Sequence, residues 1–492
     1  MRVLSWLDEL LSRRSAGLVL LCILGAVYIT VYFKHPLYPG SKVDEAPRGW
    51  WTWTDQNRYL EESRAIGRWA LNENSYFYPV GYPALGAIFV RWMPANPFLI
   101  PNLLLVLGAT WMWWKIAQRW LSRIAALAVG VTFVLSHTWL VGQTMVIPWN
   151  TLPTQFTLLT SIWVMLAMHG KKAVCLLAGL AAVTYLCRPI DAVALAPLLV
   201  VATLRLSSWQ LRLRGGVAGM AIVAAAVVGV GLMNLAVIGQ WQTAYEIVST
   251  QAIGFFGYPM SYKLYWLLVD GTPLFGETDP ALLFRFPWLF LAVAGFLFLL
   301  QRERAAGGAV FAAIAVNLTL YFNYNDLLPS DIYRFTLIHY IAWIFPLLFL
   351  LIAAAIRQLR RSQWVQLGLG IAAGLAVVCS GLRLEARGVS QLKQSAGGFV
   401  LPNDRPLLVE FREQPLETAP ELRLESRALV EYSEYLVPYL PSHLRVLLGT
   451  AASGQALSFI DQEKARGAML VSRYGWSWQW DPTRWNGRVN SQ

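Results

Sequence analysis

Residues 50–64 combine acidic, basic and phenolic side chains with a cluster of tryptophans, a mixture that could carry out acid–base chemistry. On a helix, Asp55, Arg58, Tyr59 and Glu62 occupy positions i, i+3, i+4 and i+7 and share one face. Asp55 would lie in the first turn, where the helix dipole favours the ionised carboxylate that a general base needs at neutral pH. The spacing therefore predicts one pocket built around Asp55.

The alternative is an ordinary helix at a membrane surface, with tryptophan anchors and ion pairs between residues three or four apart. Carboxylates near a membrane face are common. Composition and spacing alone therefore favour this structural interpretation over the catalytic one.

Several cations are candidates for binding an anionic ligand such as a phosphate: Arg58, Arg188, Lys263 and Arg334. A buried cation is costly without an anion, and a bound phosphate would neutralise it. The alternative for each is snorkelling or pairing with Asp191, Asp270 or Asp331. His339 follows Arg334 by about one helical turn, and a lone histidine there is more often structural than catalytic.

Composition places these residues in a membrane protein. The chain has 492 residues, of which 56% are hydrophobic and 14% charged, and its mean hydropathy is +0.46. The net charge of +12 comes mainly from the segments between alternate apolar stretches, which hold many Arg and Lys residues and only Asp8, Glu9 and Glu303 as acids. By the positive-inside rule these segments face the cytosol, so the basic excess reflects topology and not nucleic-acid binding.

Apolar stretches predict about eleven transmembrane helices, starting inside and ending outside. They lie at residues 16–33, 98–114, 124–141, 152–168, 173–186, 192–204, 217–235, 286–300, 309–322, 335–356 and 365–382. No small-residue cleavage site follows the first stretch, so we expect a retained anchor rather than a signal peptide. All four cysteines fall in apolar stretches, and neither CxxC nor HExxH occurs, so no disulfide framework or Cys/His metal site is predicted.

Residues 1–382 are thus predicted to form a membrane domain with two long external loops, 34–97 and 236–284. The first loop should carry two juxtamembrane helices, 55–71 and 82–93, the second of them amphipathic. Residues 383–492 contain mixed charges and many prolines, which indicates a small soluble domain outside the membrane. Possible strands at 407–411 and 446–448 and a helix at 426–436 predict an α/β fold for it.

The stretch from Asp55 to Glu61, placed after one span and followed by the Tyr-rich residues 76–83, resembles the polytopic C-type (GT-C) glycosyltransferases, in particular the lipid A aminoarabinose transferase and protein O-mannosyltransferase branch. Arg188-Pro189 and Tyr333-Arg334 extend the resemblance, which covers the membrane part only. It implies an enzyme of the bacterial inner membrane with a periplasmic active site and a cytoplasmic N-terminus. Asp55 would be the catalytic base, and the donor a sugar on polyprenyl phosphate such as undecaprenyl phosphate.

The resemblance also implies an acceptor in the cell envelope, either a glycan, a glycolipid or a protein. The expected substrate-binding residues are Arg58, Tyr59, Glu62, Tyr82, Arg188, Lys263, Arg334 and His339. Two features depart from the family. The segment Pro148-Trp149-Asn150-Thr151 lacks the second acid that many relatives have after the third span, and Tyr78-Pro79 replaces a Glu-Lys-Pro motif. No cofactor is therefore predicted firmly, and a divalent cation (Mg²⁺ or Mn²⁺) is the one candidate.

Three other functions remain open from the sequence. A transporter or flippase would place paired charges or broken helices at the bilayer midplane, whereas the ionisable residues here cluster at the outer face. A polymerase or ligase that uses a sugar on a lipid pyrophosphate would share the external site and the arginines. A non-catalytic scaffold would use the loops to bind partner proteins.

Overall fold

The computed structural model describes residues 13–43, 48–255, 260, 264–269, 281–324, 337–388, 393–395, 398–400, 407–413, 466–472 and 477–478. The chain forms two compact units. The first comprises Met1–Val248, Leu291–Tyr321 and Ile338–Ala372, and the second Ser249–Phe290, Phe322–Leu337 and Ala373–Gln492. These units cut across the predicted domain boundary at residue 382, which stays a prediction.

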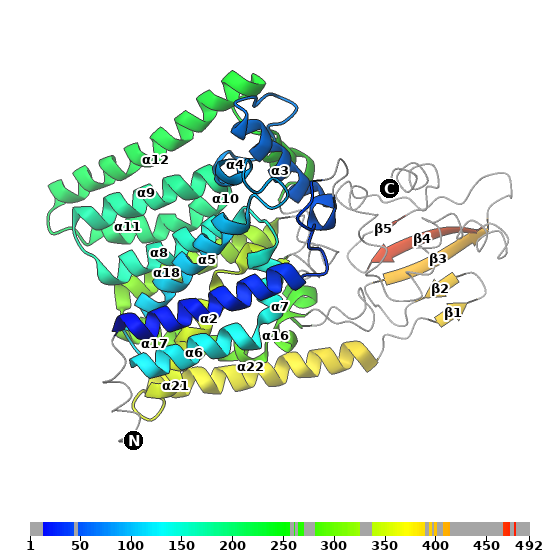
Figure 1. Cartoon of the computed structure of the whole chain (residues 1–492). Coiled ribbons are helices and arrows are strands. Elements are labelled where there is room, and N and C mark those ends of the chain that lie inside the picture. The colour runs from blue at the N-terminus through cyan, green and yellow to red at the C-terminus, as the bar shows by residue number, and fades with distance from the viewer. Residues whose placement is uncertain are drawn as a thin grey trace. The chain divides into compact units, whose positions relative to one another are not determined.

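Six helices of the first unit lie side by side in the order α12, α9, α8, α5, α2 and α6 (Figure 1). Their bounds are Trp209–Ile238, Lys171–Cys187, Thr151–Ala167, Leu99–Ala117, Arg13–Lys34 and Arg123–Ser136. Helix α21 (Ile344–Gln358) packs against α6 and α17 (Ala292–Arg302). Two long helices complete the described bundle, α18 (Arg304–Asn323) and α22 (Gln363–Gly388).

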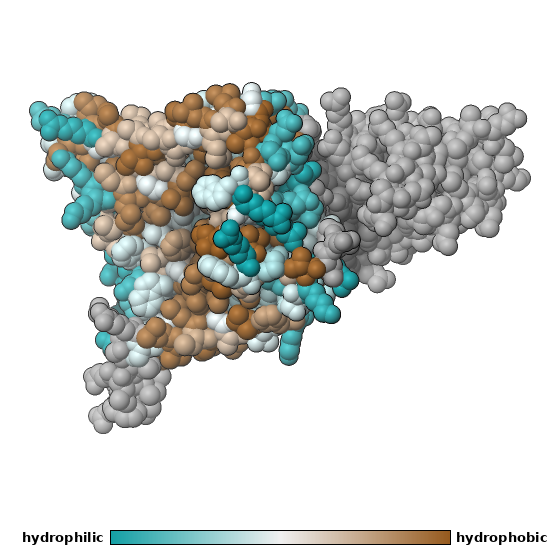
Figure 2. Space-filling view, turned by 45° about the horizontal axis from the view of Figure 1, so that its top comes forward, coloured by the Kyte–Doolittle hydropathy of each residue, from teal (hydrophilic) through white to brown (hydrophobic). Residues whose placement is uncertain are grey.

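Five of the described helices are long and apolar enough to cross a membrane: Ser15–Lys34, Leu99–Ala117, Trp209–Ile238, Arg304–Asn323 and Gln363–Ser380. Shorter apolar helices cover Arg123–Ser136, Thr151–Ala167, Pro189–Leu204, Pro287–Arg302 and Ile344–Gln358. Apolar side chains cover much of the helical surface visible in Figure 2, and hydrophilic ones gather at its edges and in a patch near its middle. The chain is thus a helical membrane protein, while the number of eleven spans and their orientation stay predictions.

Prolines start the short helical pieces into which one of the predicted spans is divided. Residues 192–204 belong to α10 (Pro189–Ala192), a 3-10 turn (Val193–Leu195) and α11 (Ala196–Leu204). Pro189 and Pro197 occupy the first turns of α10 and α11. A proline has no amide hydrogen to donate to the preceding turn, so it starts a helix rather than continuing one.

The first predicted external loop contains three short elements: a 3-10 turn at Gly49–Thr52, α3 (Thr54–Gly67) and α4 (Gly81–Phe89). Both helices end about four residues before the predicted limits. Helices α3 and α4 pack closely, because Ser63 Oγ donates to the Tyr59 and Pro83 carbonyls at 2.7 and 2.8 Å. The loop therefore carries a rigid helix pair that can position side chains.

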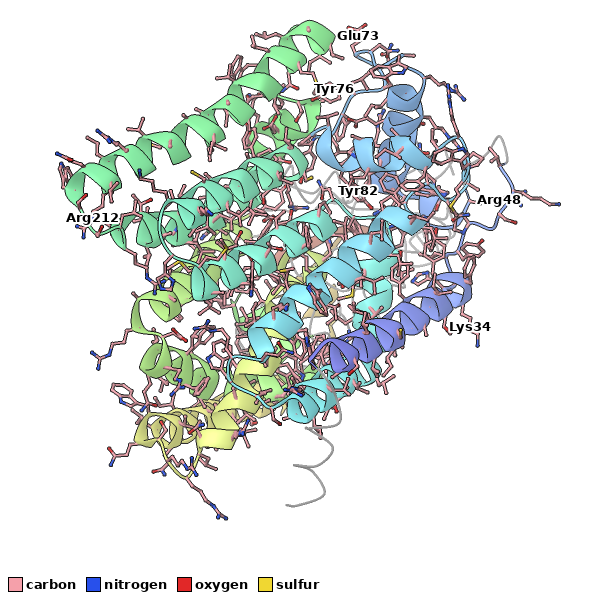
Figure 3. All side chains as sticks on the ribbon, turned by 60° about the vertical axis from the view of Figure 1, so that its left-hand side comes forward. Lys34, Arg48, Glu73, Tyr76, Tyr82 and Arg212 are labelled. Atoms are coloured by element: carbon pink, nitrogen blue, oxygen red, sulfur yellow. The ribbon has the colours of Figure 1, made fainter. Side chains whose placement is uncertain are left out.

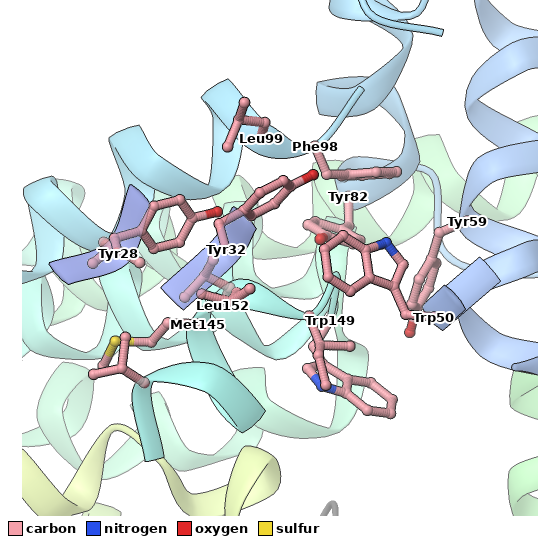
Figure 4. Packing of buried hydrophobic residues seen from close by; sticks show 14 of the residues in the cluster. Tyr28, Tyr32, Trp50, Tyr59, Tyr82, Phe98, Leu99, Met145, Trp149 and Leu152 are labelled. Carbon is pink, nitrogen blue, oxygen red and sulfur yellow. The ribbon is translucent and has the colours of Figure 1, made fainter. Parts of the chain in front are cut away.

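An aromatic cluster ties this loop to the C-terminal end of α2 and the N-terminal end of α5 (Figure 4). The rings of Tyr32 and Trp50 are 5.1 Å apart, and Tyr82 stacks on Phe98 at 4.5 Å. The Tyr32 hydroxyl donates to Asn96 Oδ1 at 2.7 Å. Burial of so many large rings stabilises the loop by several kcal/mol, at about 25 cal/mol per Å² of apolar surface.

The described strands of the second unit form one antiparallel sheet in the order β1-β2-β3-β4-β5. They span Lys393–Ser395, Gly398–Val400, Leu407–Glu413, Arg466–Ser472 and Ser477–Trp478. The longest pair, β3 and β4, aligns Leu407 with Ser472 and Glu413 with Arg466. Strand β3 covers the predicted strand 407–411, whereas the predicted helix 426–436 and strand 446–448 lie outside the described residues. The α/β fold of this segment stays a prediction.

Candidate active site

Two buried tryptophans fix the start of α3 and thereby place Asp55. The amide of Trp50 donates to the Leu37 carbonyl at 2.8 Å, and the indole N–H of Trp51 donates to the Ala95 carbonyl at 2.8 Å. Trp53 is the N-cap residue, so Asp55 lies in the first turn as predicted. The positive end of the helix dipole there favours an ionised carboxylate.

Asp55 is half-buried in the structure. Burial raises its pKa above the usual 3.8, whereas a hydrogen bond from Tyr78 and the positive charge of Arg188 lower it, and the net shift is upward. A carboxylate of raised pKa is a better proton acceptor than a solvent-exposed one. Asp55 thus has the environment of a general base.

Four tyrosines form a continuous array beside Asp55. The rings of Tyr59 and Tyr78 are 4.4 Å apart, those of Tyr78 and Tyr245 are 4.6 Å apart, and Tyr82 meets Tyr59 at 5.1 Å. Tyr245 comes from the second predicted external loop, and its amide donates to the Phe77 carbonyl at 3.0 Å. Burial raises the pKa of the Tyr59 and Tyr78 hydroxyls well above the usual value, so both remain hydrogen-bond donors.

Glu62 points into the same region but contacts the backbone. Its Oε2 accepts hydrogen bonds from the amides of Tyr78 at 3.0 Å and Phe77 at 3.4 Å. The side chain is fully buried, its Oε1 has no hydrogen-bond partner among the described residues, and burial raises its pKa to about 8. Glu62 therefore positions Tyr78, which in turn contacts Asp55.

Arg188 is buried in a network of its own. Its Nε lies 3.3 Å from Asp191 Oδ2 and donates to the Tyr321 hydroxyl at 2.7 Å, while Nη1 donates to Asn150 Oδ1 at 2.6 Å. Tyr321 also donates to Asp191 Oδ1 at 2.5 Å, and the guanidinium lies 4.5 Å from the centre of the Tyr340 ring. The pairing with Asp191, left open by the sequence, is thus present in the structure.

Besides Glu62 Oε1, two more buried polar atoms near these groups have no hydrogen-bond partner among the described residues. They are Gln56 Oε1 and Asn150 Nδ2. Gln56 follows Asp55 in the chain and donates through Nε2 to the Pro148 carbonyl at 3.0 Å, and Asn150 contacts Arg188. Because buried polar atoms are nearly always satisfied in folded proteins, an unpartnered acceptor and donor here point to a site that receives polar ligand groups.

The remaining predicted residues lie in different surroundings. Arg58 is half-exposed, lies 3.9 Å from Glu61 and stands over the Phe77 ring at 5.4 Å. Tyr82 is fully buried and donates to Asn102 Oδ1 at 3.1 Å, within the packed interior seen in Figure 3. His339 stacks on Trp149 with ring centres 4.1 Å apart. Lys263 and Arg334 lie outside the described residues.

A metal site does not form around Asp55 within the described part of the chain. No three His, Cys, Asp or Glu side chains gather there closely enough to hold an ion. Asn150 lies in the segment 148–151, which lacks the second acid of the family that the chain resembles, and its Oδ1 accepts a hydrogen bond from Arg188. The described residues around Asp55 do not fit a divalent ion bridged by two carboxylates.

No protein-family model, curated protein or solved structure matches the chain.

Sequence analysis missed the role of three of these residues. Tyr78 belongs to the Tyr-rich residues 76–83 of the family resemblance and to a departure from a family motif, but no role is predicted for it, and none is predicted for Tyr245 or Tyr321. The one available signal was the high tyrosine content of residues 76–82, because a phenol that enters a buried site usually brings its hydroxyl to a partner. Tyr245 and Tyr321 carry no local signal, since their importance comes from contacts with distant segments.

Proposed function

We propose that the chain is a membrane glycosyltransferase that moves a sugar from a polyprenyl-phosphate donor to a hydroxyl of a glycan, glycolipid or protein outside the cytoplasm. The observation that carries the proposal is the environment of Asp55: a carboxylate of raised pKa, at the start of a helix in the first predicted external loop, hydrogen-bonded by Tyr78 and close to the charge of Arg188. The half-buried position leaves Asp55 open to a substrate.

The reaction is a single inverting displacement. Asp55 takes the proton of the acceptor hydroxyl, the acceptor oxygen forms a bond to C1 of the sugar, and the bond between C1 and the phosphate oxygen breaks. The electron pair of that bond stays on the leaving lipid phosphate. Gln56 Oε1 and Asn150 Nδ2 would bind sugar hydroxyls, which satisfies both atoms.

The leaving phosphate needs a cation, and the described arginines differ in how available they are. Arg188 is already bound to Asp191, Tyr321 and Asn150, so it is not available to bind the phosphate. Its positive charge acts mainly by favouring the ionised form of Asp55. Arg58 is only loosely paired with Glu61, is half-exposed and lies one turn from Asp55. Among these described arginines, Arg58 is therefore the one that we expect to bind the phosphate. Its ionic hydrogen bond would stabilise the negative charge that develops on the leaving phosphate.

The test uses the purified full chain in liposomes, with radiolabelled pentoses and hexoses on polyprenyl phosphate, and measures release of free polyprenyl phosphate. Asp55→Asn keeps the shape of the side chain and should lower the rate by about 10²–10⁴-fold, because the base is lost. The matched control is Glu73→Gln, an exposed carboxylate of the same loop, which should act like the wild type. A correctly inserted Asp55→Asn protein with near-normal transfer would exclude this mechanism.

A second variant of the same experiment examines the role of Tyr78. Tyr78→Phe removes the hydrogen bond that favours ionised Asp55, so the pKa of Asp55 should rise further. A base works only when ionised, so the acidic limb of the kcat/KM profile should move to higher pH, while Tyr38→Phe should leave it in place.

Activity with lipid-pyrophosphate donors alone would support the polymerase or ligase instead.

A further inference from the structure

A basic pocket lies at the opposite end of the bundle from Asp55. Helix α5 starts at Leu99, directly after the predicted external loop, and ends at Ala117, so the residues that follow it lie at the far end. The pocket has a volume of about 250 Å³, many times what one water molecule needs. Its charged lining residues are Arg119, Arg302 and Arg361, and no acidic residue lines it.

Three separate segments build this pocket and are fastened to one another. Trp120, which follows α5, meets the Phe298 ring of α17 edge-on at 5.9 Å. Ser362, before α22, donates to Gln301 Oε1 of α17 at 2.5 Å. These contacts make the pocket a packed part of the fold rather than a gap between loose chain ends.

Positive charge in the pocket is poorly neutralised. Arg119 is paired with Glu303 at 2.8 Å, whereas Arg302 and Arg361 form no ion pair in the described part of the chain. The buried indole Nε1 of Trp120 has no hydrogen-bond partner among the described residues either. Two free guanidinium groups and an unused N–H donor together form the donor set that a phosphate group accepts from.

We propose that this pocket binds a phosphate-bearing anion, held by Arg302, Arg361 and the indole N–H of Trp120. Two sources can supply the same chemistry: the headgroup of an anionic phospholipid, or free phosphate. The surroundings favour the lipid, because the flanking apolar side chains of Ile356 and Trp364 are 52% and 53% exposed and would lie against acyl chains.

The positive-inside rule assigns this end of the bundle to the cytoplasmic leaflet, where anionic lipids attract arginines. The site is separate from Asp55 and does not depend on the function proposed above. Its occupation would join α5, α17 and α22 through one anion and so stabilise the bundle.

The test titrates the purified full chain in neutral detergent with phosphatidylglycerol, phosphatidylcholine or inorganic phosphate, and measures bound ligand by native mass spectrometry together with the melting temperature. Phosphatidylglycerol should bind the wild type and raise its melting temperature, and phosphatidylcholine should not. Arg302→Gln/Arg361→Gln should weaken phosphatidylglycerol binding by at least about tenfold, since each arginine near a membrane surface is worth about 1 kcal/mol.

The control removes the same charge elsewhere. Arg214→Gln/Arg304→Gln changes two exposed arginines that do not line the pocket and should bind like the wild type. Trp120→Phe keeps an aromatic side chain and all the arginines of the pocket but removes the N–H donor, so it should weaken phosphatidylglycerol binding. This variant tests the proposal even if Arg302→Gln/Arg361→Gln folds poorly. Equal protection by inorganic phosphate, with displacement of the lipid, would identify free phosphate as the source. The proposal would be overturned if phosphatidylglycerol and inorganic phosphate each bound equally well to the wild type, to Arg302→Gln/Arg361→Gln and to Trp120→Phe.

Discussion

At the residue scale, one helical face contains side chains with different tasks. At about 100° per residue, Asp55, Tyr59 and Glu62 fall within one inward sector of α3, and Arg58 falls at its edge. Tyr59 and Glu62 are accordingly buried and Arg58 is half-exposed. Tyr59 packs in the tyrosine array, Glu62 holds the backbone of Tyr78, and Asp55 retains access to a substrate.

Glu62 should make stability depend on pH. Its pKa rises from 4.5 to about 8 on folding, so the folded chain keeps a proton that the unfolded chain releases above pH 4.5. The resulting stabilisation is complete below pH 4.5 and is lost as the pH rises to about 8. Glu62→Gln mimics the protonated acid, so the stability of this variant should fall less with pH than that of the wild type. Above pH 8 its melting temperature should be higher than that of the wild type. Thermal melting across this range provides the measurement.

Glu73→Gln is the control for this prediction, because Glu73 is exposed and should leave the decline unchanged. If Glu62→Gln loses stability with pH as steeply as the wild type, Glu62 is ionised in the folded chain and the pH dependence has another origin.

At the element scale, the site depends on how closely α4 approaches α3 and α5. A Cβ on Gly86 would lie 2.6 Å from both Phe98 Cζ and Ser63 Oγ. Neither neighbour can move easily, since Phe98 is stacked on Tyr82 and Ser63 donates hydrogen bonds to two carbonyl groups. The absence of a side chain at Gly86 therefore allows the helix pair that positions Asp55 and Tyr78.

Gly86→Ala should lower the free energy of unfolding by about 1–3 kcal/mol through overpacking, partly offset by the higher helix propensity of alanine. The matched control is Gly179→Ala in α9, where a Cβ meets nothing within 4 Å, so that this variant should be neutral or slightly more stable. Melting temperatures of both variants in detergent test the prediction. Equal melting temperatures for the two variants would show that the helices can separate to accept the methyl group.

At the scale of the whole molecule, charge distribution predicts the orientation in the membrane. Lys34, Arg48 and Glu73 lie toward one end of the described bundle and Arg212 toward the other (Figure 3). The basic segments that include Arg212 should face the cytosol, since cationic loops are retained on that side.

Cysteine labelling in intact cells tests this orientation. In a variant without Cys22, Cys175 and Cys379, Glu73→Cys should react with a membrane-impermeant maleimide from outside, and Arg214→Cys only after permeabilisation. Cys187 can remain because it is buried. The reverse labelling pattern would place Asp55 in the cytosol and exclude an acceptor outside the cell.

Properties that depend on neighbouring residues could be predicted from the amino-acid sequence. Apolar length predicted membrane helices, and a helix was found in each of the apolar stretches. The spacing of residues 55–62 predicted a helix with one functional face, and α3 covers these residues. Both results follow because hydrophobic length and helical periodicity are local properties that tertiary packing rarely overrides when they are strong.

The tertiary structure was needed to find what surrounds Asp55. Arg188 and Tyr321 are 133 residues apart and share a hydrogen bond, and Tyr245 reaches Tyr78 from another loop. It also decided that Arg188 is paired with Asp191 and that Arg302 and Arg361 meet at one pocket. Such contacts depend on how whole helices pack, and no pattern within a single segment encodes which distant side chains will fill the space between them.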